Sequence, residues 1–123
     1  MVRILIVDDS PTQLFTLKKM LTKHGFEILT AENGADGVET AKQELPDLIL
    51  MDVVMPKLNG FQATRQISRN VSTSHIPIIL VTTKDQETDK IWGQRQGAKS
   101  YITKPVDETT LINTINDLLA KPA

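Results

Sequence analysis

The sequence predicts a doubly wound α/β domain, in which a five-stranded parallel sheet carries helices on both faces. Short apolar runs without polar alternation recur along the chain, as expected for strands that are buried on both sides. Segments with apolar residues at helical spacing separate these runs, so strand and helix alternate five times. Right-handed crossovers between parallel strands then place the helices on both faces of the sheet.

The first strand is predicted at Ile4-Leu5-Ile6-Val7, and a helix follows from Ser10. Ser10 can cap this helix, Pro11 suits its first position, and Gln13 completes a capping box. Gly25 is expected to end the helix. Leucines at helical spacing predict the face that packs on the sheet: Leu14, Leu17 and Leu21.

A short second strand is predicted at 26–30, and Asn33-Gly34 opens a helix that ends before Pro46. The third strand, 48–51, is a run of four apolar residues that ends in Asp52. The apolar side of the intervening helix is predicted to consist of Ala35, Val38 and Ala41.

The second half of the chain continues the alternation with a helix at 60–70 and a strand at 76–81. Asp85 can cap the next helix, which Gly97 ends, and a fifth strand is expected at 99–103. A final helix begins after Asp107, and its apolar face is predicted to comprise Leu111, Ile112, Ile115, Leu118 and Leu119.

The composition is that of one globular domain, because the 123 residues are 40% hydrophobic and 24% charged. The sequence contains no cysteine, which excludes disulfides, zinc–thiolate sites and thiol catalysis. A net charge of −1 offers no basic field for nucleic acid or membranes, and the first apolar run is too short for a signal peptide. We therefore expect a monomeric cytoplasmic domain over residues 1–123, with no effector domain, nucleic acid partner or membrane insertion.

Four of the five predicted strands are followed by a residue of functional type: Asp8 and Asp9, Asp52, Thr82, and Lys104. In a parallel sheet these carboxyl ends lie along one edge, where open α/β sheets bind their ligands. Each of these residues alone could be a helix cap or a loop residue. Their coincidence at one edge favours a shared site.

Charge then indicates what this edge binds. Three carboxylates held together repel one another, and oxygen ligands without His or Cys favour a hard cation such as Mg²⁺. Mg²⁺ together with Lys104 balances the three acids and suits a phosphoryl group, to which the Thr82 hydroxyl can also bind. We assign Asp52 as the nucleophile, Asp9 to the metal directly, and Asp8 to the metal through water or as a support of its shell.

The sequence resembles a two-component response-regulator receiver domain from about residue 3 to residue 119. The resemblance is carried by Asp8-Asp9, Asp52 followed by Met55-Pro56 and Asn59-Gly60, Thr82, and Lys104-Pro105. It implies a flavodoxin-like (βα)5 fold with strand order 2-1-3-4-5. It also implies that Asp52 accepts a phosphoryl group from a histidine kinase with Mg²⁺ bound, without separate substrate turnover.

The resemblance implies further site residues. The backbone carbonyl of Val54 would join Asp9 and Asp52 as a metal ligand, and the Lys104-Pro105 bond would be cis. Tyr101 would be a switch that turns inward when Thr82 moves toward the phosphoryl group. The helix after Asp85, the strand 99–103 and the last helix would then form the surface that changes affinity for a downstream partner.

Two segments, 59–65 and 82–90, are similar to stand-alone receivers of the chemosensory systems that control type IV pilus twitching motility. This narrower resemblance implies a kinase of the chemosensory, CheA-like type. It leaves two roles open: driving output, or serving as a phosphate sink for a sister regulator. Val54 and Lys84 are neither amides nor acids, unlike their counterparts in fast-dephosphorylating chemotaxis receivers, so we expect slower self-dephosphorylation.

Other functions remain to be weighed against the switch. A phosphatase with an aspartyl-phosphate intermediate needs an acid two residues after its nucleophile, where this chain has Val54. A flavin carrier needs a loop rich in Gly, Ser and Thr after the first strand, where Asp8-Asp9 would repel phosphate. A scaffold independent of phosphorylation would leave the acidic edge without a purpose. Trp92 either fills the core or is an exposed anchor for a partner.

Overall fold

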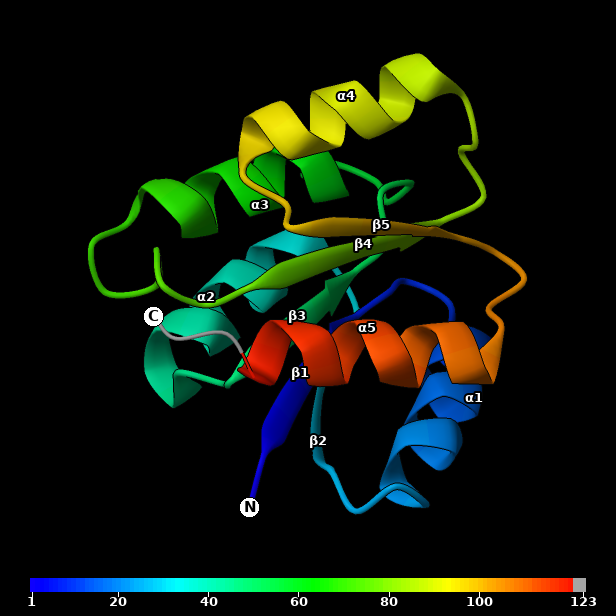
Figure 1. Cartoon of the computed structure of the whole chain (residues 1–123). Helices are drawn as coiled ribbons and strands as arrows, with labels where there is room; N and C mark the ends of the chain where they lie inside the picture. The colour runs from blue at the N-terminus through cyan, green and yellow to red at the C-terminus, as the bar shows by residue number, and fades with distance from the viewer. Residues whose placement is uncertain (121–123) are drawn as a thin grey trace.

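The computed structural model describes residues 1–120 and shows strands and helices in strict alternation (Figure 1). The predicted end of the domain at residue 123 lies outside the described residues. The elements are β1 (Arg3–Val7), α1 (Pro11–Thr22), β2 (Glu27–Ala31), α2 (Gly34–Glu44), β3 (Leu48–Met51), α3 (Gly60–Arg69), β4 (Ile78–Thr82), α4 (Glu87–Gln96), β5 (Ser100–Thr103) and α5 (Glu108–Ala120).

The five strands form one parallel sheet in the order β2-β1-β3-β4-β5. The sheet order and the fold class are therefore as predicted. Because the chain reverses direction across the sheet between β1 and β3, the carboxyl ends of these two central strands flank the point where ligands bind in such folds.

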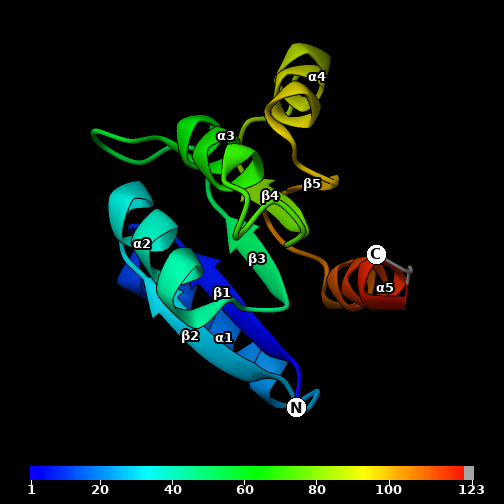
Figure 2. The same ribbon diagram turned by 90° about the vertical axis from the view of Figure 1, so that its left-hand side faces the viewer.

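Two apolar clusters fill the two faces of the sheet. Alternate strand residues such as Leu5 and Leu80 pack with α2 and α3, and their neighbours, such as Ile6 and Val81, pack with α1 and α5. Figure 2 shows α2 and α3 on one side of the sheet and α5 on the other. The central strands β3 and β4 are buried along their whole length, as unbroken apolar runs predict.

Helix ends follow the predicted chemistry with two exceptions. Gly97, directly after α4, and Gly25, three residues after the end of α1, have φ values of +113° and +88°, in the left-handed conformation that glycine favours. The Ser10 side chain accepts from the Gln13 N–H, but the second half of the predicted capping box is wrong, because the Ser10 N–H donates to Asp8. Asp85 does not cap α4 either. Gln86 does, and its N–H donates to Asp89 at 3.2 Å.

One prediction about a helix face is corrected, and one open alternative is resolved. Ala35 is exposed, and Gly37 takes its predicted place in the core because it packs closely on Val7. Trp92 is 48% exposed and Ile91 is similar, so Trp92 does not fill the core. Among residues 1–120, none of the helices combines the length and the apolar character that crossing a membrane requires.

Candidate functional site

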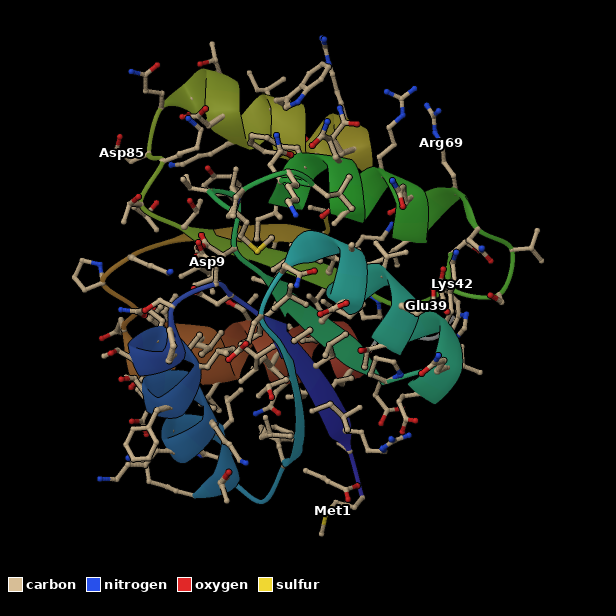
Figure 3. All side chains as sticks on the ribbon, turned by 180° about the vertical axis from the view of Figure 1, so that it is seen from behind. Met1, Asp9, Glu39, Lys42, Arg69 and Asp85 are labelled. Atoms are coloured by element: carbon tan, nitrogen blue, oxygen red, sulfur yellow. The ribbon has the colours of Figure 1, made fainter. Side chains whose placement is uncertain are left out.

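Backbone hydrogen bonds carry the sheet one residue beyond its strands and so fix the positions of the site residues. Asp8 N–H donates to Ala31 O at 3.1 Å, Asp52 N–H to Val7 O at 2.9 Å, and Lys104 N–H to Thr82 O at 2.8 Å. These bonds hold residues from four strand ends along one edge. Figure 3 shows Asp9 at this edge, on the same side of the molecule as Asp85.

A buried ion pair lies at the centre of the edge. Lys104 Nζ is 2.8 Å from Asp8 Oδ2 and 3.7 Å from Asp52 Oδ2. The other oxygen of Asp8 accepts the Ser10 N–H at 2.9 Å, so both oxygens of this carboxylate, which is 2% exposed, are bound. The cap of α1 thus also orients a site carboxylate, a role that the sequence analysis missed.

Asp52 is 8% exposed, and its two oxygens differ. Oδ1 accepts the Val53 N–H at 2.8 Å, whereas Oδ2 faces Lys104. Burial raises the pKa of the Asp52 carboxyl above its ordinary value, and the neighbouring Asp8 carboxylate raises it further. The Lys104 ammonium and the Val53 hydrogen bond oppose this shift but do not cancel it.

The acidic group has the chemistry of a site for a hard cation. Asp8, Asp9 and Asp52 each present an oxygen, and these three atoms lie within 4.8 Å of one another. Asp9 is exposed, so a solvated ion can approach from its side. Three carboxylates against one ammonium leave an excess of two negative charges, which a divalent ion would neutralise. The residues present therefore fit Mg²⁺.

The loop after Asp52 is folded tightly beneath the site. A Cβ at Gly60 would overlap the carbonyl oxygen of Asp52, so only glycine fits at this first position of α3. Val54 is exposed, Pro56 is exposed, and Met55 is buried. Pro56 and the next two residues of this loop line a pocket that Asp9 also borders.

Thr82 and Tyr101 lie on the face of the sheet that carries α4. Thr82 is fully buried, and its Oγ1 accepts the Lys84 N–H at 3.3 Å. The Tyr101 ring packs against the cluster shared by α2 and α3, and its hydroxyl donates to the Lys84 carbonyl at 2.7 Å. Burial, followed by Asp89 and Asp85, raises the pKa of Tyr101 to about 12.

The geometry of the final loop is as predicted, because the Lys104-Pro105 peptide bond is cis. Asp8, Asp9, Asp52 and Lys104 thus lie together at one edge, and Thr82 is held at the same edge by its backbone. Phe15, which was not among the predicted site residues, is 67% exposed on α1. The sequence does contain a signal for it, because Phe15 is a large apolar residue directly after Leu14 and therefore lies outside the leucine face of the helix.

Comparison with known proteins now decides the family. A family model described as the response regulator receiver domain matches residues 4–116. The chain belongs to this family. It is 67% identical to the protein PilH of Pseudomonas aeruginosa over 120 residues, which cover 98% of this chain and 99% of PilH.

Solved receiver structures agree with this assignment. The chemotaxis protein CheY4 of Vibrio cholerae matches with a TM-score of 0.90 and 29% identity, covering 96% of this chain and 98% of CheY4. The receiver domain of sensor histidine kinase PA1611 from Pseudomonas aeruginosa matches with a TM-score of 0.90 and 28% identity, covering 98% of both chains. That structure has a magnesium ion coordinated in its active site cleft.

Proposed function

We propose that this receiver accepts a phosphoryl group on Asp52 from a histidine kinase and thereby switches its affinity for a protein partner. The observation that carries the proposal is the Asp52 carboxylate, held among Asp8, Asp9 and Lys104 with one oxygen facing the Lys104 ammonium. Neither the loop acid of a phosphatase nor the phosphate loop of a flavin carrier is present at the expected positions.

Asp52 Oδ2 is the proposed nucleophile because Oδ1 is already bound to the Val53 N–H. Oδ2 forms a bond to phosphorus as the bond between phosphorus and the kinase histidine nitrogen breaks, and the histidine leaves with the bonding electron pair. Lys104, 3.7 Å from Oδ2, neutralises negative charge on the transferred group. The Thr82 hydroxyl turns from its present hydrogen bond toward that group.

Mg²⁺ would be held by Asp9, Asp52 and the Val54 backbone carbonyl, with Asp8 acting through water. It supplies charge neutralisation for the phosphoryl oxygens and for the three acids. Asp8 in turn positions Lys104 through the 2.8 Å ion pair and is itself oriented by Ser10. The same residues support both formation and hydrolysis of the aspartyl phosphate.

The output surface is proposed to comprise α4, β5 and α5. Thr82 and Tyr101 are linked through Lys84, which donates to one and accepts from the other. A movement of Thr82 toward the phosphoryl group therefore changes the loop that leads into α4. The half-exposed Trp92 lies on this helix and would be an anchor for the partner.

The kinase is proposed to dock on α1. Exposed Phe15 and the stems of neighbouring lysines line an apolar groove there, and α1 begins two residues after Asp9. The residues that surround Phe15 are Lys18, Lys19, Thr22 and Lys23. An apolar groove rimmed by positive charge suits a partner surface with apolar residues bordered by carboxylates.

The similarity to PilH along the whole chain supports a role as a stand-alone, monomeric, cytoplasmic regulator in type IV pilus twitching motility, with a CheA-like kinase. Such a single domain either drives output or drains phosphate from a sister regulator. The two roles differ in one measurable respect: a sink loses its phosphate without binding an output partner more tightly.

The proposal is tested by incubating the protein with acetyl phosphate and Mg²⁺ and measuring its mass. Wild type should gain one acid-labile phosphoryl group, and EDTA should prevent this gain. Asp52→Asn should gain none, whereas Asp117→Asn, which changes an exposed carboxylate of α5, should be labelled like wild type. Equal labelling of Asp52→Asn would refute the assignment.

A further inference from the structure

At one edge of the sheet a strand turns backbone groups outward. β2 is the terminal strand beside β1, and Figure 2 shows it at the rim of the sheet with α2 over one of its faces. Glu27 N–H donates to Val2 O at 2.9 Å, so the odd-numbered residues of β2 face β1. Ile28 and Thr30 therefore direct their N–H and C=O groups away from the sheet, where residues 1–120 provide no backbone partner. Such an edge is a template for pairing with another chain.

An acidic groove of about 470 Å³ lies along this edge, where β2 leads into α2. Three carboxylates line the acidic groove, and none of its described lining residues is basic. None of the three forms an ion pair within residues 1–120, in a protein whose net charge is only −1. The acidic groove is therefore a local concentration of negative charge beside the outward backbone groups of β2. The three residues, all exposed, are Glu32, Asp36 and Glu39.

The two edges of the sheet differ in the sign of their charge. Beside β5, at the opposite edge, Lys90 and Lys99 border a pocket whose described lining residues include no acid. A cationic strand is therefore attracted to β2 and repelled at β5. A second copy is a poorer occupant, because pairing β2 with β2 sets like charges along one pair of strands. Pairing β2 with the β5 of a second copy is heterologous and extends into chains or rings, whereas most oligomers are twofold symmetric dimers.

We propose that β2 binds an extended, cationic segment of a different protein, which joins the sheet as a further strand. Ile28 and Thr30 supply the backbone hydrogen bonds, and the three carboxylates of the acidic groove bind lysine or arginine side chains. Side chains alternate between the two faces of a strand, so the cations occupy every second position. The positions between them face the α1 side of the sheet, where Ile28 and Phe26 are only partly buried. The segment is therefore one in which basic and apolar residues alternate.

This surface is separate from the surfaces used in the proposed function. β2 and β5 lie at opposite edges of the sheet, so a segment bound to β2 leaves the proposed output surface accessible. Binding at β2 requires no phosphoryl group on Asp52. A partner held there would tether the domain in both of its phosphorylation states.

The proposal is tested by fluorescence anisotropy with a labelled peptide that alternates lysine with valine. The peptide should bind the wild-type protein, and binding should weaken as salt is added because the charges are exposed. A peptide that alternates glutamate with valine should bind at least about tenfold more weakly. A lysine–valine peptide that is N-methylated at every residue keeps its charge but has no backbone donors, so it should also bind at least about fivefold more weakly.

Variants of the protein separate the backbone contribution from the charge. Thr30→Pro removes an outward N–H and keeps the bonds to β1, because proline is tolerated at a strand edge, and it should bind the peptide about fivefold more weakly. Thr30→Val keeps the N–H and should bind like wild type. Glu32→Gln together with Glu39→Gln should weaken binding about fivefold and reduce its salt dependence. Asp117→Asn, which alters an exposed acid of α5, is the matched control and should change neither.

Equal binding of the N-methylated and unmodified peptides means attraction without strand pairing and overturns the inference, as does equal binding by wild type and Thr30→Pro. If Thr30→Pro does not fold, the N-methylated peptide with wild-type protein decides. Self-association of wild type that is lost in Thr30→Pro would identify a second copy as the occupant and would also overturn it. Asp52→Asn should bind the peptide like wild type, and Thr30→Pro should be labelled by acetyl phosphate, so this inference and the proposed function fail separately.

Discussion

Replacing Lys104 by methionine should destabilise the protein strongly, because the ammonium neutralises buried acids. Its Nζ lies 2.8 Å from Asp8 and 3.7 Å from Asp52. At an effective dielectric constant of about 20, these separations correspond to roughly 6 and 4.5 kcal/mol of attraction. Desolvation of the three groups on folding offsets much of that attraction, so the intact cluster contributes little net stability.

Lys104→Met differs from the intact cluster because the buried acids remain while their cation is lost. Asp8 is 2% exposed and would be left without its cation. Removing one partner of a buried ion pair typically costs about 3–5 kcal/mol, a large fraction of an ordinary stability of about 5–15 kcal/mol. We expect Lys104→Met to lose an amount in this range in EDTA at about pH 7. The loss should shrink in acid, where the carboxylates bind protons.

Urea unfolding monitored by Trp92, the single tryptophan of the chain, measures this loss. Mg²⁺ should stabilise Lys104→Met more than wild type, because it brings positive charge back to the acidic edge. The double variant Asp8→Asn with Lys104→Met should recover much of the lost stability, and Lys42→Met, which alters an exposed lysine of α2, should change little. A loss below about 1 kcal/mol, or a double variant no better than the single one, would refute the reasoning.

Four further outcomes are expected. Asp52 holds its proton to higher pH in the folded than in the unfolded chain, so its stabilising contribution is complete below the unfolded pKa of 3.8 and is lost as pH rises through the folded pKa. Asp52→Asn should therefore become more stable relative to wild type as pH rises in EDTA. Urea unfolding at several pH values measures this difference in stability, and a difference that stays constant or changes in the opposite direction would contradict the prediction. The single tyrosine, Tyr101, should titrate with a pKa of about 12 by phenolate absorbance in the folded protein, and a folded midpoint near the ordinary value of 10.0 would contradict its burial near acids. Phe15→Ala should slow phosphoryl transfer from the kinase by about tenfold while leaving labelling by acetyl phosphate unchanged, and equal loss in both assays would count against a docking role. Mass measurements over time should show aspartyl phosphate outlasting a half-life of seconds, and changing Val54 to Asn together with Lys84 to Glu should shorten its lifetime.

The sequence predicted the strands and the functional edge well because both depend on strong local signals. Unbroken apolar runs such as 48–51 have few alternatives to a buried strand, and a polar residue directly after such a run must lie at the sheet edge. The positions of Asp8, Asp52 and Thr82 follow from that rule. Lys104 does not, because it follows the mixed strand Ser100–Thr103.

The errors arose where several residues compete for one role. Asp85 and Gln86 are both able to cap α4, and the choice depends on how the loop leaves β4. The Ser10 N–H could donate to Gln13 or to Asp8, and in the folded protein it donates to the Asp8 carboxylate. The Thr64 hydroxyl is buried without a hydrogen-bond partner within residues 1–120, and the sequence held no signal of this, because it results from how the helices pack.

The alternation of side chains along the strands divides this edge between the two faces of the sheet. Lys104 follows Ile102 in pointing toward α1 and α5, and it meets Asp8 and Asp52 there, whereas Thr82 and Tyr101 share the opposite face with Leu80. Substitution of Lys104 or Asp8 should thus mainly alter how fast Asp52 is phosphorylated, and substitution of Tyr101 should mainly alter how the phosphorylated protein binds its partner. Thr82, which is proposed to contact the phosphoryl group and is linked to Tyr101 through Lys84, should affect both. After gene duplication, the phosphorylation rate or the partner affinity could therefore change in one copy while the other property is retained.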